Sequence, residues 1–324
     1  MVLGLVAFQF VIGFAALFAA GFVEGMAATL GRRPPVPPNP DAATIFALAA
    51  GATLVFALLA AGRRYGRDAR RALAVRLPAG KHLVLVLLLL LPLLVVAGVV
   101  TAELTAAARA AGVPVGLTGP TAGLVDSLRD YPGWRAAAVV VGFLGVAIGV
   151  GEEVLFRGVL GRGLVARWGL WRGIGLTTVL FGAFHIYPVQ AAVAGLIGLV
   201  LHAAYLWTRS LSVPVVLHAG YNCLAVLGGL AGAGAGADPA GDAGVPSGVA
   251  VTGVAAGAAV GWALYRTRTR WALPDGAVWS PGFPTAESPP AAAGARLVVG
   301  RAGVGAVALV AAAYLAFAAA VVLG

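Results

Sequence analysis

The chain has 324 residues, of which 60% are hydrophobic and 10% charged, whereas roughly 25% of the residues in a soluble globular domain are charged. This composition excludes a large soluble domain and predicts a protein that lies mostly within a lipid bilayer. The formal net charge of +10 does not indicate a nucleic-acid partner, because the basic residues fall in short loops between apolar runs, where membrane topology places them.

Long apolar stretches follow one another along the whole chain. A stretch of about 18 residues or more crosses a hydrocarbon core of ~30 Å as a helix, and about nine stretches meet this criterion. The first has no positively charged n-region, so we interpret it as a span and not as a signal peptide. The sequence predicts an all-α, polytopic transmembrane helix bundle. The expected spans are 2–23, 44–62, 83–101, 136–160, 173–189, 191–208, 211–232, 248–265 and 303–323.

The loops between these spans predict an orientation in the membrane. Most of the 22 Lys and Arg residues fall in the loops that are cytoplasmic if the N-terminus is cytoplasmic. Because cytoplasmic loops carry an excess of Lys and Arg, we expect an integral cell-membrane protein with its N-terminus in the cytoplasm and its C-terminus outside. Residues 272–300 are rich in Pro, Gly and Ala and are interpreted as a flexible cytoplasmic loop.

Two acidic residues lie deep in an apolar segment. Of the 12 Asp and Glu residues, only Glu152 and Glu153 lie well within a predicted span. A carboxylate at this depth costs about 2.5 to 3.5 kcal/mol to insert and by default marks a functional site. The spacing of Glu153 and Arg157 predicts an ion pair on one helix face. That pair leaves Glu152 unexplained, because it is rotated by ~100° from Glu153.

Histidine and asparagine side chains are expected at a similar depth. Counted at 1.5 Å per residue from the nearest cytoplasmic arginine, Glu152 lies ~15 Å deep, His185 ~20 Å and His218 ~14 Å. Asn222 follows His218 by four residues and therefore shares its helix face.

A carboxylate, two imidazoles and a carboxamide at one depth are suited to hydrolysis. Glu152 could take a proton from water, one histidine could hold the water, and the other, with Asn222, could donate hydrogen bonds to a tetrahedral oxyanion. Alternatively, Glu152, His185 and His218 could hold zinc and leave a position open for water. The sequence does not choose between a zinc site and a site without metal.

Three motifs resemble those of the CPBP family of membrane proteases, which includes CAAX prenyl proteases and bacteriocin-processing enzymes of the Abi type. Residues 152–157 fit E-E-x-x-x-R, residues 181–185 fit F-x-x-x-H, and residues 218–222 fit H-x-x-x-N, in the order found in the family. Each motif alone is weak, but the three together on successive spans are specific. The resemblance covers roughly residues 136–232.

The resemblance implies roles for the motif residues. Glu152 would activate water together with His185, while His218 and Asn222 would stabilise the oxyanion. Glu153 would support this catalytic arrangement together with Arg157, and Phe181 would shape the site. The family has been described both as metalloendopeptidases and as glutamic proteases, so the resemblance leaves the metal open.

A functional division of the chain follows from the resemblance. We expect N-terminal spans and loops in residues 1–135, a catalytic core on the fourth to seventh spans in residues 136–232, and C-terminal spans in residues 233–324. The expected partners are membrane lipid and a protein or peptide substrate, with lipidated substrates as one class.

Two alternatives to a peptidase remain at this point. A proton-coupled membrane transporter would also place Glu, His and Arg in its spans. A non-catalytic immunity or scaffold protein could keep the fold without the activity. Three other classes of intramembrane protease lack support, because the sequence contains no H-E-x-x-H motif, no G-x-S-G motif and no pair of intramembrane aspartates.

Overall fold

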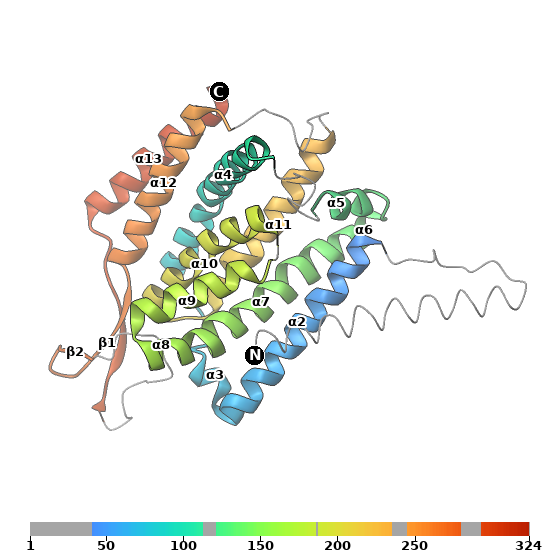
Figure 1. The fold of residues 1–324 in the computed structure, drawn as a ribbon. Helices are drawn as coiled ribbons and strands as arrows, with labels where there is room; N and C mark the ends of the chain where they lie inside the picture. The colour runs from blue at the N-terminus through green and yellow to red at the C-terminus, as the bar shows by residue number, and fades with distance from the viewer. Residues whose placement is uncertain (1–40, 113–120, 186, 235–244, 280–292, 324) are drawn as a thin grey trace, which may run out of the picture.

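The computed structural model describes residues 41–112, 121–185, 187–234, 245–279 and 293–323. This part of the chain is a bundle of long helices with one small β-sheet (Figure 1). The first predicted span, residues 2–23, lies outside the described residues.

The helices follow in chain order. The first half of the described chain contains α2 (Ala42–Tyr65), the 3-10 turn η1 (Gly66–Asp68), α3 (Ala69–Ala72), α4 (Gly80–Ala110), α5 (Thr121–Arg129) and a continuous helix made of α6 (Gly133–Ala137), η3 (Ala138–Ala147), α7 (Ile148–Glu152), η4 (Glu153–Gly161) and α8 (Arg162–Trp168). The second half contains α9 (Leu170–Ala183), α10 (Pro188–Thr208), α11 (Ser212–Gly234), α12 (Ser247–Arg266) and α13 (Val304–Leu323).

Seven helical segments in the described residues are long and apolar enough to cross a membrane. They are Ala42–Ala72, Gly80–Ala110, Gly133–Trp168, Pro188–Thr208, Ser212–Ala231, Ser247–Arg266 and Val304–Leu323. Each overlaps one of the expected spans, so the polytopic helical bundle that the sequence predicts is confirmed.

The structure differs from the prediction at the expected span 173–189. Helix α9 has 14 residues, which corresponds to ~21 Å and is too short for a core of ~30 Å. The helix ends at Ala183, and a new helix, α10, begins at Pro188. Proline has no amide hydrogen to donate within a helix, and Tyr187 before it is extended, as such residues usually are. The apolar run is therefore divided between two helices.

A second difference concerns the loop predicted at 272–300. Strands β1 (Thr269–Ala272), β2 (Val278–Trp279) and β3 (Arg296–Val299) form an antiparallel sheet in the order β2-β1-β3. Trp271 lies opposite Trp279 on one side and Leu297 on the other. Aromatic and branched residues favour strands, and Gly276, with φ at +85°, allows the turn between β1 and β2. The described part of the chain is thus not purely α-helical.

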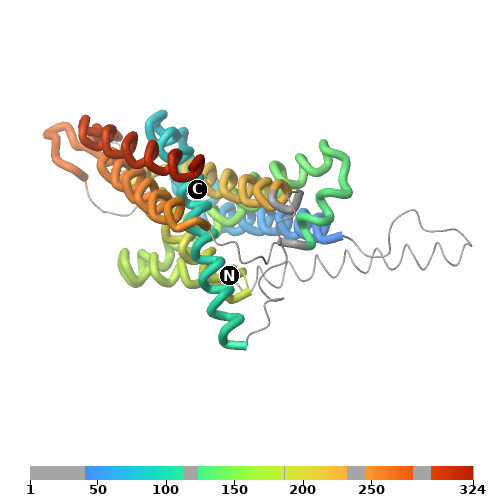
Figure 2. Tube along the Cα trace, turned by 90° about the horizontal axis from the view of Figure 1, so that it is seen from above, coloured from blue at the N-terminus to red at the C-terminus, as the bar shows by residue number. Residues whose placement is uncertain are grey.

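The long helices pack around α4 and around the continuous helix Gly133–Trp168. Helices α12 and α13 pack together at one edge of the bundle, and α2 and α5 lie at the opposite edge (Figure 2). Pro92 lies inside α4, where it cannot donate a hydrogen bond to the carbonyl of Leu88. The hydroxyl of Tyr314 in α13 donates to that carbonyl instead, so a polar group freed by the proline finds a partner within the bundle.

Candidate active site

The two glutamates lie in the middle of the helix Gly133–Trp168. Glu152 is the last residue of α7, and Glu153 is the first residue of the π-helical segment η4. A second π-helical segment, η3, precedes α7. Short π-helical turns are frequent at functional sites. Both glutamate side chains are buried, with 5% and 0% of their residue surface exposed.

Glycines let two neighbouring helices approach the glutamates. A Cβ atom on Gly151 would lie 2.9 Å from the backbone nitrogen of Leu54 in α2, and one on Gly149 would lie 3.3 Å from Ala219 in α11. Small residues of this kind allow close backbone packing between membrane helices. The close contact at Gly149 brings α11, which carries His218 and Asn222, against the helix that carries the glutamates.

Arg157 is completely buried and holds Glu153 one helical turn away. Its Nη1 donates to Oε1 of Glu153 at 2.8 Å, so the ion pair that the spacing predicts is confirmed. Its Nη2 donates to the carbonyl oxygen of Gly198 in α10 at 2.9 Å, and its Cζ lies 4.3 Å from the centre of the Phe181 ring. These three contacts compensate for the desolvation of the guanidinium and fix the position of Glu153.

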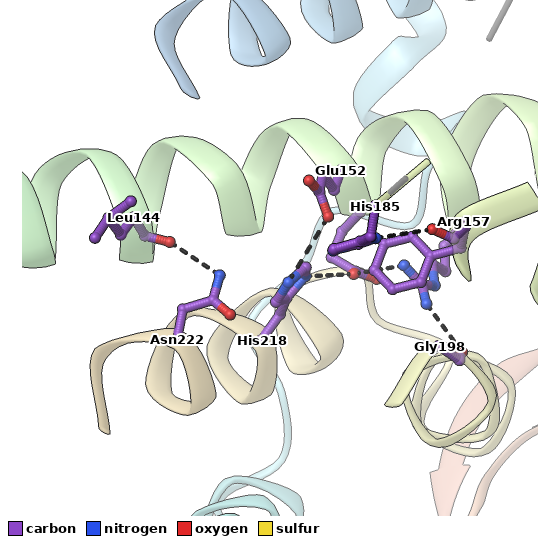
Figure 3. Close-up of polar contacts among 9 residues, drawn as sticks. Leu144, Glu152, Arg157, His185, Gly198, His218 and Asn222 are labelled. Atoms are coloured by element: carbon purple, nitrogen blue, oxygen red, sulfur yellow. Dashed lines mark hydrogen bonds and ion pairs between the residues drawn. The ribbon is translucent and has the colours of Figure 1, made fainter. Parts of the chain in front are cut away.

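His218 contacts both glutamates, and Figure 3 shows it beside Glu152. Its Nδ1 is 2.9 Å from Oε1 of Glu153, whereas its Nε2 is 3.8 Å from Oε2 of Glu152, beyond hydrogen-bonding distance. A carboxylate only accepts hydrogen bonds, so Nδ1 carries the proton in the contact with Glu153. This tautomer leaves Nε2 facing Glu152.

One carboxylate oxygen of Glu152 forms no hydrogen bond within the described part of the protein. This oxygen, Oε2, is buried. Most buried polar atoms in native structures have a partner, either in the protein or in an ordered water. The position of this oxygen therefore favours a water molecule or a substrate group as its partner.

His185, after the end of α9, and Asn222, one turn beyond His218 on α11, complete the cluster. His185 follows the end of α9 and is not inside a helix; its Nδ1 is 3.0 Å from the carbonyl oxygen of Phe181. Its ring centre lies 5.3 Å from that of Phe181, which in turn lies 5.9 Å from the ring of His218. Asn222 donates from Nδ2 to the carbonyl oxygen of Leu144 at 3.0 Å, which holds its amide beside η3.

A cavity of about 440 Å³ joins these groups. Glu152, His185, His218 and Asn222 all line it, so four of the candidate residues meet at one space. Most of the remaining wall is apolar and comes from α2, α5, η3, α7, α9 with the residue that follows it, α10 and α11, including Phe46, Phe184, Val193 and Ile197. A mostly apolar pocket with a few convergent polar groups is typical of a substrate site.

Sequence reasoning missed several polar contributions to this site. The carbonyl of Gly198, which accepts a hydrogen bond from Arg157, is a backbone group, so the sequence does not indicate its role. Thr53, Tyr187 and Gln190 line the cavity, but isolated uncharged polar residues do not stand out in a hydropathy pattern. Gln190 lies between two expected spans but in the first turn of α10, and its amide is the signal that could have indicated a polar wall there.

The candidate zinc ligands are only partly brought together. Among the residues that the structure describes, no group of three or more His, Cys, Asp and Glu side chains could hold a metal ion. Glu152 and His218 face each other, but a catalytic zinc site takes three protein ligands. In this arrangement the pair is one ligand short of such a site.

The fold and the site define a polytopic helical membrane protein with carboxylate, imidazole and carboxamide groups around a cavity inside the bundle. Residues 134–224, fewer than a third of the chain, match a family model described as type II CAAX prenyl endopeptidase Rce1-like. The matched segment contains all three motifs, so the match supports the resemblance to the CAAX protease family seen in the sequence. No curated protein and no solved structure matches the chain.

Proposed function

We propose that this protein is an intramembrane endopeptidase that hydrolyses peptide bonds of membrane-associated proteins or peptides with a water molecule activated by Glu152. The observation that carries the proposal is the cavity at which Glu152, His185, His218 and Asn222 meet. The family of residues 134–224 supports proteolysis as the reaction class.

Glu152 is the proposed general base. Glu152 lines the cavity, and its buried Oε2 has no hydrogen-bond partner among the described residues, so the carboxylate can accept a proton from a water molecule bound there. The water oxygen adds to the carbonyl carbon of the peptide, and the proton passes to Glu152. When the tetrahedral intermediate collapses, the same proton goes to the leaving amine. His185 borders the same cavity and is proposed to orient the water.

His218 and Asn222 are the proposed donors to the oxyanion. Nδ1 of His218 uses its proton in the hydrogen bond to Glu153. Nε2 can therefore donate to the oxyanion only when it carries a second proton, that is, when the ring is an imidazolium. Asn222 uses one amide hydrogen for the carbonyl of Leu144 and keeps the second. One donor of this kind contributes about 3 to 4 kcal/mol to transition-state stabilisation.

Glu153 and Arg157 are proposed to position His218 and not to touch the substrate. Both side chains are completely buried. Oε1 of Glu153 receives hydrogen bonds from Arg157 and His218, so it holds the imidazole in the tautomer that turns Nε2 toward Glu152. This is the role that an orienting carboxylate has beside a catalytic histidine in other hydrolases.

The apolar wall of the cavity supports a substrate that reaches the site within the membrane. Phe46, Phe184, Val193 and Ile197 offer contacts to apolar side chains or to a lipid attached to the substrate. We propose a protein or peptide substrate that is embedded in, or anchored to, the bilayer.

The proposal is tested by cleavage of a fluorogenic peptide library with purified protein in micelles. We expect cleavage by the wild type and its loss in His218→Gln, with equal folded fractions of the two proteins. Equal cleavage by both would contradict the proposed site. A parallel reaction with a chelator tests metal dependence: loss of activity would show that a metal takes part. Absence of cleavage together with proton-coupled uptake in proteoliposomes would favour the transporter instead.

A further inference from the structure

Arg76 and Arg209 lie close together at the end of the bundle where the loops between residues 63 and 81 and around residue 209 lie, here called the basic end. The pair is called the corner. Arg209 follows the last residue of α10 in a left-handed conformation, with φ at +51°, and its Nε donates to the carbonyl oxygen of Thr269 at 3.2 Å. Nε of Arg76 donates to the carbonyl oxygen of Arg209 at 2.6 Å. The guanidinium of Arg76 lies 5.9 Å from the ring centre of Trp271. Each arginine is thus held in place by its Nε, which leaves the Nη atoms available.

The corner has positive charge without a matching carboxylate in the described part of the chain. The ion pairs found there involve neither Arg76 nor Arg209. Arg209 is 7% exposed and Arg76 is half-buried, and burial lowers the pKa of both guanidinium groups. The charge of Arg76 lowers the pKa of Arg209 further, so the two cations lie close enough to repel each other. An anion between them would relieve that repulsion.

Both arginines lie in short connections between membrane-spanning helices, where lipid headgroups are expected. Arg76 lies between the spans Ala42–Ala72 and Gly80–Ala110, and Arg209 between Pro188–Thr208 and Ser212–Ala231. Tryptophan, such as Trp271 here, is enriched at the membrane–water interface. Basic pockets between membrane helices on the cytoplasmic side bind anionic headgroups, and the planar fork of arginine suits phosphate oxygens.

We propose that Arg76 and Arg209 bind the phosphate group of an anionic lipid at the basic end of the bundle. The Nη atoms of both arginines would donate to the phosphate oxygens, with Trp271 beside the headgroup. This site is separate from the cavity at Glu152, because none of these three residues lines that cavity.

The test measures lipid binding to the purified full-length protein by native mass spectrometry. The probes are phosphatidylglycerol and phosphatidylcholine with the same acyl chains. One basic residue near an anionic surface contributes about a fivefold factor in affinity, so Arg76→Gln with Arg209→Gln should weaken phosphatidylglycerol binding about 30-fold. Phosphatidylcholine binding should stay unchanged. The matched control is Arg167→Gln with Arg172→Gln, two exposed arginines whose removal changes the net charge equally.

Three results would overturn the proposal: equal phosphatidylglycerol binding by the double variant and the wild type, equal loss in the control, or displacement of the lipid by millimolar inorganic phosphate. The last result would identify a soluble anion as the occupant. If the double variant does not fold, Arg76→Gln alone leaves the bond from Arg209 to Thr269 intact. It should bind phosphatidylglycerol about fivefold more weakly, and unchanged binding would again contradict the proposal.

Discussion

Arg157 is the residue whose loss should destabilise the site most. Arg157→Ala leaves the buried carboxylate of Glu153 and the carbonyl of Gly198 without their cation. Removing one partner of a buried ion pair typically costs about 3 to 5 kcal/mol. We therefore expect a large fall in the thermal unfolding temperature in detergent, with loss of the ordered site.

An exposed pair provides the control for this prediction. Arg129 and Asp126 are 3.2 Å apart, with 41% and 72% of their side chains exposed. Exposed pairs contribute about 0 to 1 kcal/mol, so Arg129→Ala should leave the unfolding temperature nearly unchanged. Similar effects of the two substitutions would show that the pair with Glu153 has no special structural role.

The sequence predicts contacts within one helix better than contacts between helices. The pair of Glu153 and Arg157 follows from a spacing of four residues. The contact between Glu153 and His218 joins residues 65 positions apart, and no local pattern encodes it. The three motifs identify the acidic and histidine side chains that line the cavity, together with Asn222, but their roles in catalysis remain predictions.

At the scale of elements, the hairpin of α9 and α10 depends on a glycine. A Cβ atom on Gly182 would lie 2.5 Å from the carbonyl oxygen of Ala191, so Gly182→Ala must push the two helices apart. Overpacking of this kind costs about 1 to 3 kcal/mol. Because His185 follows the end of α9, we also expect peptide cleavage to fall, measured with the same substrate as for the wild type.

Gly175 is the matched control on the same helix. A Cβ atom there would meet nothing within 4 Å. Alanine favours helix over glycine by about 0.8 to 1 kcal/mol, so Gly175→Ala should keep or raise stability and leave cleavage unchanged. If Gly182→Ala behaves in the same way, the close approach of α9 and α10 is not needed for the site.

Element lengths are where the sequence prediction is weakest. Hydropathy treats residues 173–189 as one run, because apolar residues continue across the break between Ala183 and Pro188. The sheet formed by β1, β2 and β3 is missed because its strands are short and lie in a stretch rich in Pro, Gly and Ala. Such strands carry too few residues for an alternating pattern to be visible.

At the scale of the whole molecule, the orientation in the membrane can be measured directly. The sequence predicts that the basic loops are cytoplasmic, and the division of the chain at residues 135 and 232 is likewise still a prediction. Cys223 is the single cysteine, so Cys223→Ala provides a background for labelling. Leu77, near the basic end, is 93% exposed, and Trp134, at the start of the helix that carries Glu152, is 75% exposed.

In sealed right-side-out vesicles, an impermeant maleimide should label Trp134→Cys and not Leu77→Cys. Permeabilised vesicles, in which both sites react, provide the control. The reverse pattern would contradict the positive-inside prediction for this chain. The lining of the cavity runs from the middle of the helices toward the ends remote from the basic loops. The same experiment therefore indicates the side of the membrane from which the site is reached.

The most direct test of the central claim is the rate of peptide cleavage by Glu152→Gln. The amide keeps the shape of the side chain but cannot accept the proton of water as a general base, which typically contributes about a 100- to 10,000-fold factor in rate. We expect a loss of this size in Glu152→Gln, with an unchanged unfolding temperature, while Glu103→Gln at an exposed position of α4 keeps full activity. Full activity of Glu152→Gln would contradict the proposal that Glu152 activates the water.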